Sequence, residues 1–409
     1  MAVWSGAKSI RRGWILAALL LAACTVSPEK ASAPEPTNDV MQEVAREVLE
    51  ANVPGFMARI GNGQEVQYTA LGVADRQTER AMKATDQFQI GSATKTFMAT
   101  LTLQLVDEGK VDLDAPIEEY LPGLLPDGAD ITVRMLLNHT SGLYNYTEDD
   151  GYWRAWEADP QRLWTEKELV QIAVDKGLNF VPGENYSYSN TGYTVIGMML
   201  QERTGQTLSE LLEQRITGPL GLKRTYLPRP VATDTGPGYA HGYVLRFIGT
   251  KPNYTDTVSW PVDGLSGAAG AMVADQDDVA TFFSALLTGK LFSAEQLAQM
   301  KTVVDRPADF PVGSGYGLGL LKSTNSCGTV WGHGGQTEGH RSLSAVTEDG
   351  VGTVVMDLTA VPMSENPNDG TRRWDEVVAA AEETAVCRML GKPVPAEVMA
   401  RLRGVPNSG

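Results

Sequence analysis

Hydrophobic positions recur along this chain with helical spacing in some segments and with the alternation of strands in others. Val40–Ala51 carries an apolar stripe at helical spacing, and Phe56–Ile60 and Glu65–Val73 read as two strands around the turn Gly61-Asn62-Gly63. Helical spacing then dominates the middle of the chain. It predicts helices over Thr94–Glu108, Val133–Asn138, Glu166–Asp175, Thr191–Arg203, Leu208–Ile216, Val279–Leu287 and Ala294–Met300.

Alternation returns toward the C-terminal end of the chain. It predicts strands over Gly317–Lys322, Thr329–Gly332, Arg341–Thr347 and Gly352–Leu358. A last helix is expected over Trp374–Leu390, and the tail after Lys392, with its prolines and glycine-rich end, is expected to be loose. Strands at both ends of a helical middle predict an α/β (α+β) fold, in which both ends of the chain build one sheet and a helical subdomain is inserted.

The N-terminus has the pattern of an export signal. Lys8, Arg11 and Arg12 precede a short apolar run that begins at Trp14 and is too short to span a bilayer stably. The residues before Cys24 match the bacterial lipoprotein box, which implies cleavage before the cysteine and diacylation of its sulfur. The alternative is an ordinary signal peptide with a chance cysteine, and the paired arginines fit twin-arginine export only loosely.

These patterns divide the chain into four parts. We expect a signal peptide over residues 1–23, a solvated tether rich in Ser, Pro, Ala and Glu over 24–38, a catalytic domain over 39–391 and the tail over 392–409. The protein is therefore predicted to be exported and lipid-anchored to the extracytoplasmic side of the membrane. We expect a monomer.

Composition narrows the function further. A formal net charge of −16 argues against a nucleic-acid partner, which requires a basic face. The four histidines are scattered without the spacing of metal ligands, so we expect neither a metal nor a cofactor.

Of the three cysteines, Cys327 and Cys387 remain as a pair when Cys24 is lipidated. In an oxidising compartment the expected state of such a pair is a disulfide, which would stabilise the fold by on the order of 3–4 kcal/mol. Two buried free thiols are the alternative.

Candidate chemistry centres on Ser92 and Lys95. Serine is a poor nucleophile at neutral pH and needs a neighbouring base. The strand-like Phe88–Ile90 runs into a helix, so Ser92 would lie at the helix N-terminus, where the dipole favours developing negative charge. Lys95 lies one helical turn later on the same face. The same spacing occurs at Ser5/Lys8 and Ser27/Lys30, but those copies lie in the signal and the tether, where no pocket can form.

Two further motifs follow in order. Tyr188-Ser189-Asn190 precedes a predicted helix and could relay protons and hold a substrate carbonyl, although by itself a helix cap with a packed tyrosine is the simpler interpretation. His333-Gly334-Gly335 follows the predicted strand Thr329–Gly332 and would supply a basic group with room for the substrate backbone. Each motif is weak alone, but their order along the chain makes them jointly a strong signal.

With these motifs the chain resembles the serine beta-lactamase and DD-peptidase superfamily. It is similar to the class C branch, and most to the secreted actinomycete D-alanyl-D-alanine carboxypeptidases. The similar stretches include Gly91-Ser-Ala-Thr-Lys-Thr-Phe, Leu103-Gln-Leu-Val-Asp-Glu-Gly-Lys, Tyr186-Ser-Tyr-Ser-Asn-Thr, Tyr316-Gly-Leu-Gly-Leu and Ser326-Cys-Gly. The resemblance implies an antiparallel sheet flanked by helices, a site between the sheet and the helical subdomain, and a Cys327–Cys387 bridge.

The resemblance also implies roles for individual residues. Ser92 would attack a carbonyl while Lys95 and Tyr188 handle the proton, with Tyr188 as a phenolate stabilised by Lys95 and His333. Backbone N–H groups of Ser92 and Gln336 would form the oxyanion hole. Asn190 would hold the substrate amide, and Trp260 would line the cleft. Several aromatic residues could form a rim near Ser92 or a packed helical core: Tyr144, Tyr146, Tyr152, Trp153 and Trp156.

The chain departs from the carboxypeptidase pattern in two places. Gly334 and Gln336 stand where the strand motif of those enzymes has threonines, and Leu321 stands where they carry an arginine. In those enzymes the two hydroxyls and the arginine receive the substrate's terminal carboxylate. Lys322 would point to the other face of the strand, whereas Arg341 could substitute if its side chain faces the cleft. These departures place carboxylate recognition in doubt.

The predicted function is therefore a serine hydrolase acting through an acyl-enzyme on small peptides or esters. A D-alanyl-D-alanine carboxypeptidase-like activity on peptidoglycan stem peptides, with beta-lactams as further ligands, is the first expectation. An esterase, a D-amino-acid amidase and a weak beta-lactamase are the alternatives. A non-catalytic penicillin-sensing lipoprotein ranks below them, because all four chemical residues are present.

Overall fold

The computed structural model describes residues 40–228, 238–248, 251–261, 267–305, 312–363 and 369–405. All of them belong to one unit, Asp39–Gly409. The predicted signal, Cys24 and the predicted tether lie outside the described residues. Within those ranges no helix is both long enough and apolar enough to cross a membrane.

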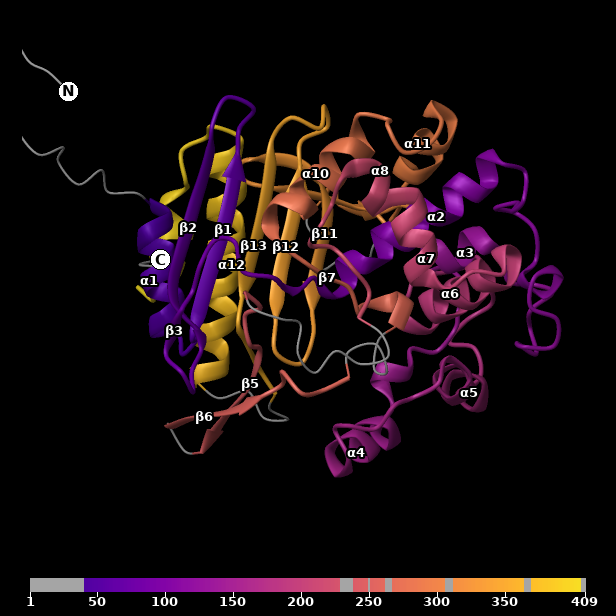
Figure 1. Cartoon of the computed structure of the whole chain (residues 1–409), viewed down its shortest axis with the longest axis horizontal. Helices are drawn as coiled ribbons and strands as arrows, with labels where there is room; N and C mark the ends of the chain where they lie inside the picture. The colour runs from indigo at the N-terminus through magenta and orange to yellow at the C-terminus, as the bar shows by residue number, and fades with distance from the viewer. Residues whose placement is uncertain are drawn as a thin grey trace, which may run out of the picture. The chain divides into compact units, whose positions relative to one another are not determined.

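Among the described residues, a nine-stranded sheet forms the centre of the fold (Figure 1). Its order is β3-β2-β1-β13-β12-β11-β10-β9-β8, and its neighbouring strands run antiparallel. β1 pairs directly with β13, so the two ends of the chain meet in one sheet and the predicted fold class is confirmed. The strands are β1 Gly55–Gly61, β2 Val66–Asp75, β3 Arg80–Ala81, β4 Phe88–Gln89, β5 Tyr243–Ile248, β6 Lys251–Asp256, β7 Val273–Ala274, β8 Val304–Asp305, β9 Gly315–Tyr316, β10 Leu321–Asn325, β11 Gly328–Gln336, β12 Arg341–Val346, β13 Thr353–Leu358 and β14 Ala360–Pro362.

Helices cover both faces of this sheet. Figure 1 shows α1 and α12 at one side and the helical region that begins with α2 at the other. The α-helices are α1 Val40–Glu50, α2 Thr94–Asp107, α3 Val133–Leu137, α4 Asp150–Ala158, α5 Glu166–Lys176, α6 Asn190–Thr204, α7 Leu208–Leu212, α8 Gly218–Leu220, α10 Gln276–Leu287, α11 Ala294–Lys301, α12 Asp369–Met389 and α13 Ala396–Leu402. Each helix predicted from the sequence is present, with ends that shift by a few residues.

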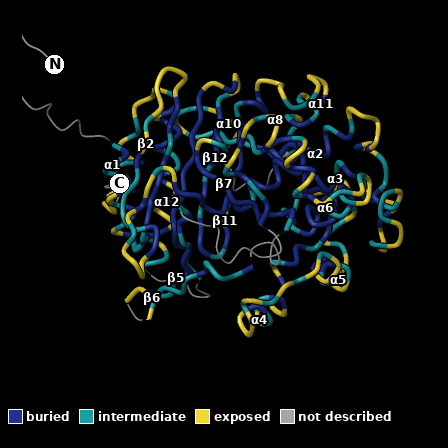
Figure 2. Tube along the Cα trace, in the orientation of Figure 1, coloured by how far each residue is buried: buried dark blue, intermediate teal, exposed yellow. Residues whose placement is uncertain are grey.

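Alternation along the strands divides the apolar side chains between two cores. Val330 packs with α1 and α12, whereas its neighbour Trp331 packs with the core that contains α2 and α10. Val354 and Val355 divide in the same way. Because successive side chains of a strand point to opposite faces, a strand covered on both faces is apolar throughout. β13 is buried at every position, and the central strands are dark blue in Figure 2.

Two strand predictions need correction near the candidate site. The predicted strand Gly317–Lys322 is wrong, because Gly319 has φ +68° and the chain turns between β9 and β10 there. β11 continues to Gln336, so His333-Gly334-Gly335 lies within a strand and does not follow one. The pairing of β11 with β12 as far as Gln336↔Arg341 supplies the hydrogen bonds that extend it.

The expectation of a loose tail after Lys392 is wrong for the helix α13. Val398 and Leu402 are buried in the core that α12 covers. Arg373 of α12 also donates to the carbonyl oxygens of Arg401 and Leu402 at 2.9 and 2.6 Å. The apolar face of α13 thus packs in a core built by segments outside the tail. This contact orders residues that were expected to be loose from their composition.

The predicted bridge between Cys327 and Cys387 is confirmed. The two cysteines form a disulfide with a Cα–Cα distance of 5.2 Å. It joins the turn before β11 to the end of α12, so it fastens the C-terminal helix to the strand that carries His333.

Candidate active site

Ser92 lies where a short strand passes into a helix. β4 is followed by one 3-10 turn, Gly91–Ala93, and then directly by α2. Ser92 is partly buried and its backbone N–H stands at the N-terminal end of the helix, where the dipole is positive. Ser92 therefore lies at a helix N-terminus, as the sequence predicts, and its role as the nucleophile stays a prediction.

Lys95 is completely buried beside this serine. Its Nζ donates to Ser92 Oγ at 3.0 Å. It also donates to Asn190 Oδ1 at 2.7 Å and to the carbonyl oxygen of Ala269 at 2.6 Å. Burial lowers the pKa of the Lys95 amine well below that of an ordinary lysine, because desolvation disfavours the charged form.

This geometry suits a base. A neutral amine that donates its two N–H bonds to Asn190 and Ala269 directs its lone pair at the hydroxyl of Ser92. A proton can then pass from Ser92 Oγ to Lys95 Nζ across a normal hydrogen bond.

Asn190 opens α6 and is held from two sides. Its backbone N–H donates to Asn145 Oδ1 at 3.1 Å, and its Nδ2 donates to Thr147 Oγ1 at 3.1 Å. The acceptor oxygen of its side chain is thereby aimed at Lys95. Asn190 therefore belongs to the site, as predicted, and contacts the lysine directly.

Tyr188 lies against the same lysine. The Lys95 Nζ is 4.8 Å from the centroid of its ring. The ring of Tyr188 has a second neighbour, His139, whose ring centroid lies 4.2 Å from that of Tyr188. The structure thus brings Tyr188 into the cluster predicted from the order of the motifs.

His139 was missed by the sequence reasoning. Its Nδ1 accepts the backbone N–H of Ser189 at 3.2 Å, and its carbonyl oxygen accepts that of Ser187 at 3.0 Å. It therefore holds the segment that presents Tyr188. Its φ of +65° shows a tight turn at that position. A histidine in the polar turn Asn138-His139-Thr140, directly after a predicted helix, was the available signal.

His333 reaches this cluster through a tyrosine. It is buried on β11, and its Nε2 lies 2.8 Å from the hydroxyl of Tyr316. The Tyr316 ring in turn lies 6.2 Å from that of Tyr188. Tyr316 is completely enclosed, and burial raises the pKa of its phenol well above the usual value. Tyr316 is a second residue that the sequence reasoning did not single out.

Two glycines allow β11 to touch the turn that carries Ser92. A Cβ on Gly335 would lie 2.0 Å from the carbonyl oxygen of Ile90. Gly91 has φ +53°, and a Cβ there would lie 2.6 Å from the backbone nitrogen of Gln336. Neither position tolerates a side chain. The backbone nitrogen of Gln336 is therefore adjacent to the turn of Ser92, which is the arrangement that an oxyanion hole of these two N–H groups requires.

The aromatic residues expected near Ser92 form a packed cluster. Tyr146, Tyr152 and Trp156 are buried, so the core interpretation holds for them. Trp260 stands edge-on to Trp156 with 4.9 Å between ring centroids. This cluster adjoins Asn190, because the backbone N–H of Tyr146 donates to Thr191 Oγ1, the next residue along α6.

Two of the positions that depart from the carboxypeptidase pattern line one cavity of about 260 Å³. Leu321 and Gly334 face it together with Arg341 and Glu382. Arg341 does not offer a free cation there, because its Nε and Nη2 lie 2.9 and 2.8 Å from Glu382 Oε1 on α12. Lys322 pairs in register with Trp331, whose side chain packs on the other face, which confirms its predicted direction.

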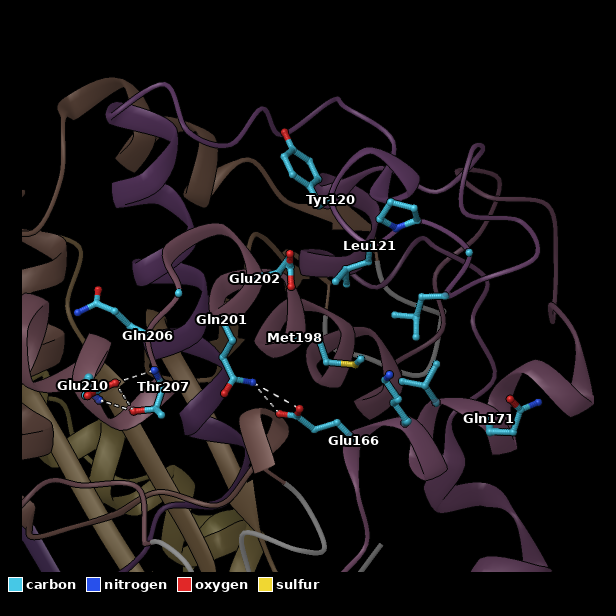
Figure 3. A pocket seen from close by; sticks show the side chains of 16 residues that line it. Tyr120, Leu121, Glu166, Gln171, Met198, Gln201, Glu202, Gln206, Thr207 and Glu210 are labelled. Carbon is cyan, nitrogen blue, oxygen red and sulfur yellow. Dashed lines mark hydrogen bonds between the residues drawn. The ribbon is translucent and has the colours of Figure 1, made fainter.

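A second, larger hollow lies in the helical region, away from Ser92. It measures about 910 Å³ and is bounded by α5, α6, α7 and residues 120–124 (Figure 3). Its hydrogen bonds, Gln201 to Glu166 and Thr207 to Glu210, join its own wall residues. In the ranges that the structure describes, no group of three or more His, Cys, Asp or Glu side chains could hold a metal ion.

A serine hydroxyl bonded to a buried lysine, beside backbone N–H groups of a strand and a helix start, is the arrangement of a serine hydrolase. Residues 41–377 match the family model described as Beta-lactamase, and the chain belongs to this family.

Three relatives illustrate its range. The putative penicillin-binding protein PbpX of Bacillus subtilis is 26% identical over 78% of this chain and 74% of its own length. The structure of a D-stereospecific amidohydrolase from Streptomyces sp. is 35% identical, with a TM-score of 0.70, covering 80% of this chain and 95% of that one. The D-amino acid amidase from Ochrobactrum anthropi SV3 is 30% identical, with a TM-score of 0.72, covering 86% and 98%.

Replacing Ser92 with alanine tests the nucleophile. A soluble form beginning at Asp39 is expected to form a covalent adduct with a fluorescent penicillin or a fluorophosphonate, and Ser92→Ala is expected to abolish it, because no other hydroxyl is bonded to Lys95 in the described structure. In-gel fluorescence and intact-mass spectrometry measure the adduct. Labelling of Ser92→Ala at the wild-type level would refute the assignment.

The lowered pKa of Lys95 predicts how acylation depends on pH. The reactive form is the neutral amine, so the acylation rate should rise with pH through the lowered pKa and reach a plateau well before pH ~10.4, the value for an ordinary lysine. Lys95→Arg keeps a cation but removes the base, and should reduce the rate by about 10²- to 10⁴-fold. A rate that still rises toward pH ~10 would contradict this role.

Proposed function

We propose that this protein hydrolyses small amides of D-amino acids through an acyl-enzyme on Ser92, and that it does not require a free carboxylate on the leaving side of the substrate. The proposal refines the expectation of a carboxypeptidase in favour of the amidase alternative. A carboxypeptidase must bind the terminal carboxylate of its peptide, and a desolvated carboxylate is costly without a cationic partner.

The ion pair between Arg341 and Glu382 is the observation that carries this proposal. It lies in the cavity that Leu321 and Gly334 line, and the resemblance puts the carboxylate-binding arginine of the carboxypeptidases at the position of Leu321. Glu382 neutralises the arginine and adds a negative charge that opposes a second carboxylate. An amide or ester leaving group carries no charge and avoids this conflict. The likeness to a D-stereospecific amidohydrolase and to a D-amino acid amidase supports an amide substrate with D stereochemistry.

The reaction proceeds in two steps. Ser92 Oγ attacks the amide carbonyl as its proton passes to Lys95, and the N–H groups of Ser92 and Gln336 stabilise the oxyanion. The proton then returns through Lys95 and Tyr188 to the leaving nitrogen, so that ammonia or an amine departs and an acyl ester remains. Water, activated by the same lysine, cleaves this ester and restores the serine hydroxyl.

We also propose that the domain works as a monomer held at the membrane by lipid on Cys24. The lipoprotein box in the sequence supports the anchor.

Substrate comparison tests the proposed function. The wild-type domain is expected to hydrolyse D-phenylalanine amide faster than it releases D-alanine from diacyl-Lys-D-Ala-D-Ala, measured as ammonia and D-alanine by coupled assays.

Leu321→Arg and Glu382→Gln should each raise D-alanine release by about tenfold, because each provides a cation for the carboxylate. Lys322→Arg is the matched control, since its side chain lies on the other face. Fast D-alanine release by the wild type would contradict the proposal, and ester turnover without amide turnover would favour an esterase.

Lipidation is tested in a bacterium with a lipoprotein pathway. Full-length protein is expected to incorporate labelled palmitate and to sediment with membranes. Cys24→Ala should remove the label and leave the protein in the soluble extracytoplasmic fraction, since the sulfur is the acceptor. A membrane-bound, unlabelled wild type would exclude the lipid anchor.

A further inference from the structure

A histidine and an aspartate are buried against each other next to the turn that follows β11. The side chains of His340 and Asp357 are fully buried, and His340 Nδ1 lies 3.2 and 3.1 Å from Asp357 Oδ1 and Oδ2. Burial raises the pKa of the Asp357 carboxyl, and the neighbouring His340 opposes that rise. Neither residue takes part in the proton transfers between Ser92, Lys95 and Tyr188.

His340 closes the turn that leads out of β11. The N–H of Thr337 donates to the carbonyl oxygen of His340 at 2.9 Å, and the N–H of His340 donates to Thr337 Oγ1 at 3.2 Å. Thr337 directly follows Gln336, the last residue of β11. The contact between His340 and Asp357 therefore joins the turn beside Gln336 to β13, a strand that is buried at every position.

The ring of His340 is also enclosed from the segment that leads into β5. A Cβ on Gly242 would lie 2.6 Å from the Cδ2 atom of this ring and 2.8 Å from its Nε2, so only a glycine fits against it. The same Nε2 lies 3.4 Å from the hydroxyl of Tyr239, which is buried as well. A carboxylate at one ring nitrogen and a phenol at the other thus hold the ring in one place.

The strand pair that holds Asp357 also contacts the turn of Ser92. Ser342 on β12 lies opposite Asp357 in register. Its buried Oγ donates at 3.1 Å to the carbonyl oxygen of Ile90, two residues before Ser92. Paired positions on β12 and β13 are therefore joined to the backbone on both sides of the proposed oxyanion hole.

We propose that His340 and Asp357 are positioning residues that hold the N–H of Gln336 where an oxyanion on the Ser92 adduct requires it. The inference rests on the proposed function in taking Gln336 as an oxyanion donor, and it applies to any acyl group. A donor stabilises the developing charge when it is already in place, and a displacement of about 1 Å costs about 100-fold in rate. Apolar side chains would fill the same space, but they make no directed bonds that fix the turn.

Removal of both members of the pair tests this inference without leaving a buried charge unpaired. The variant His340→Phe/Asp357→Leu of the full-length chain should react with a fluorescent penicillin about 10- to 100-fold more slowly at saturation. Its half-saturating concentration should change by less than about threefold, because the contacts of the unreacted ligand remain. The Kd for phenylboronic acid, whose adduct with Ser92 places an oxygen in the oxyanion hole, should rise by about 10- to 100-fold as well.

A labelling time course separates positioning from folding. Its rate constant reports on the folded molecules, whereas its final amplitude counts them. A double variant that reacts with the wild-type rate constant would overturn the inference, at full or at reduced amplitude. A loss confined to the half-saturating concentration would overturn it too. Should the double variant not fold, His340→Phe alone gives the same comparison, because the Asp357 carboxyl, whose pKa burial raises, then takes up a proton.

The matched control is His241→Phe. It removes another histidine–aspartate pair from the same segment, His241 Nδ1 and Asp256 Oδ2 at 2.8 Å, which is partly exposed. This variant should keep the wild-type rate constant, half-saturating concentration and amplitude. Failure of the proposed function looks different, since the wild type would then be labelled by the penicillin and hydrolyse no D-amino-acid amide.

Discussion

The burial of the Lys95 amine is the constraint on which the rest of the site depends. An amine without water must find hydrogen-bond partners. Lys95 finds them in Ser92, one helical turn away, and in two distant parts of the chain, Asn190 at the start of α6 and the carbonyl oxygen of Ala269. Loss of any one would leave a buried polar group unpaired, at a cost of about 1–3 kcal/mol. The same interactions that satisfy the amine therefore hold the helical region and the nucleophile in one geometry.

The sheet contacts the turn that carries Ser92 through the backbone of β11. Gly335 and Gly91 let β11 and the turn of Ser92 approach until no Cβ fits between them. This contact places the N–H of Gln336 beside Ser92. In the proposed function, the substrate therefore lies along β11. The paired Arg341 and Glu382 line the same cavity as Gly334. In the proposed function, this neutralised pair favours an uncharged leaving group.

Much of the fold follows from local sequence patterns. The helices over α2 and α6 and the strand pair at the N-terminal end have strong periodicity, and the structure confirms them. Ser92 and Lys95 were predictable because one helical turn fixes their spacing, and Tyr188 with Asn190 because they directly precede a helix. The bridge between Cys327 and Cys387 was inferred from the compartment and from the resemblance. Each of these inferences required only residues close together in the sequence, a count of the cysteines or the resemblance to a known family.

The partners of those residues were decided by tertiary structure. Sequence placed Arg341 on a strand, but only the packing of α12 on the sheet pairs it with Glu382. His139 carries no motif and Tyr316 had no predicted role, and both lie at the site because remote segments meet there. The tail helix α13 is ordered for the same reason, by apolar contacts with α12. By itself, the sequence determined that Ser92 and Lys95 lie on one face of a helix, through helical periodicity. Which charges face the substrate depends on contacts between segments far apart in the chain, and those contacts exist only once the sheet and its helices have packed.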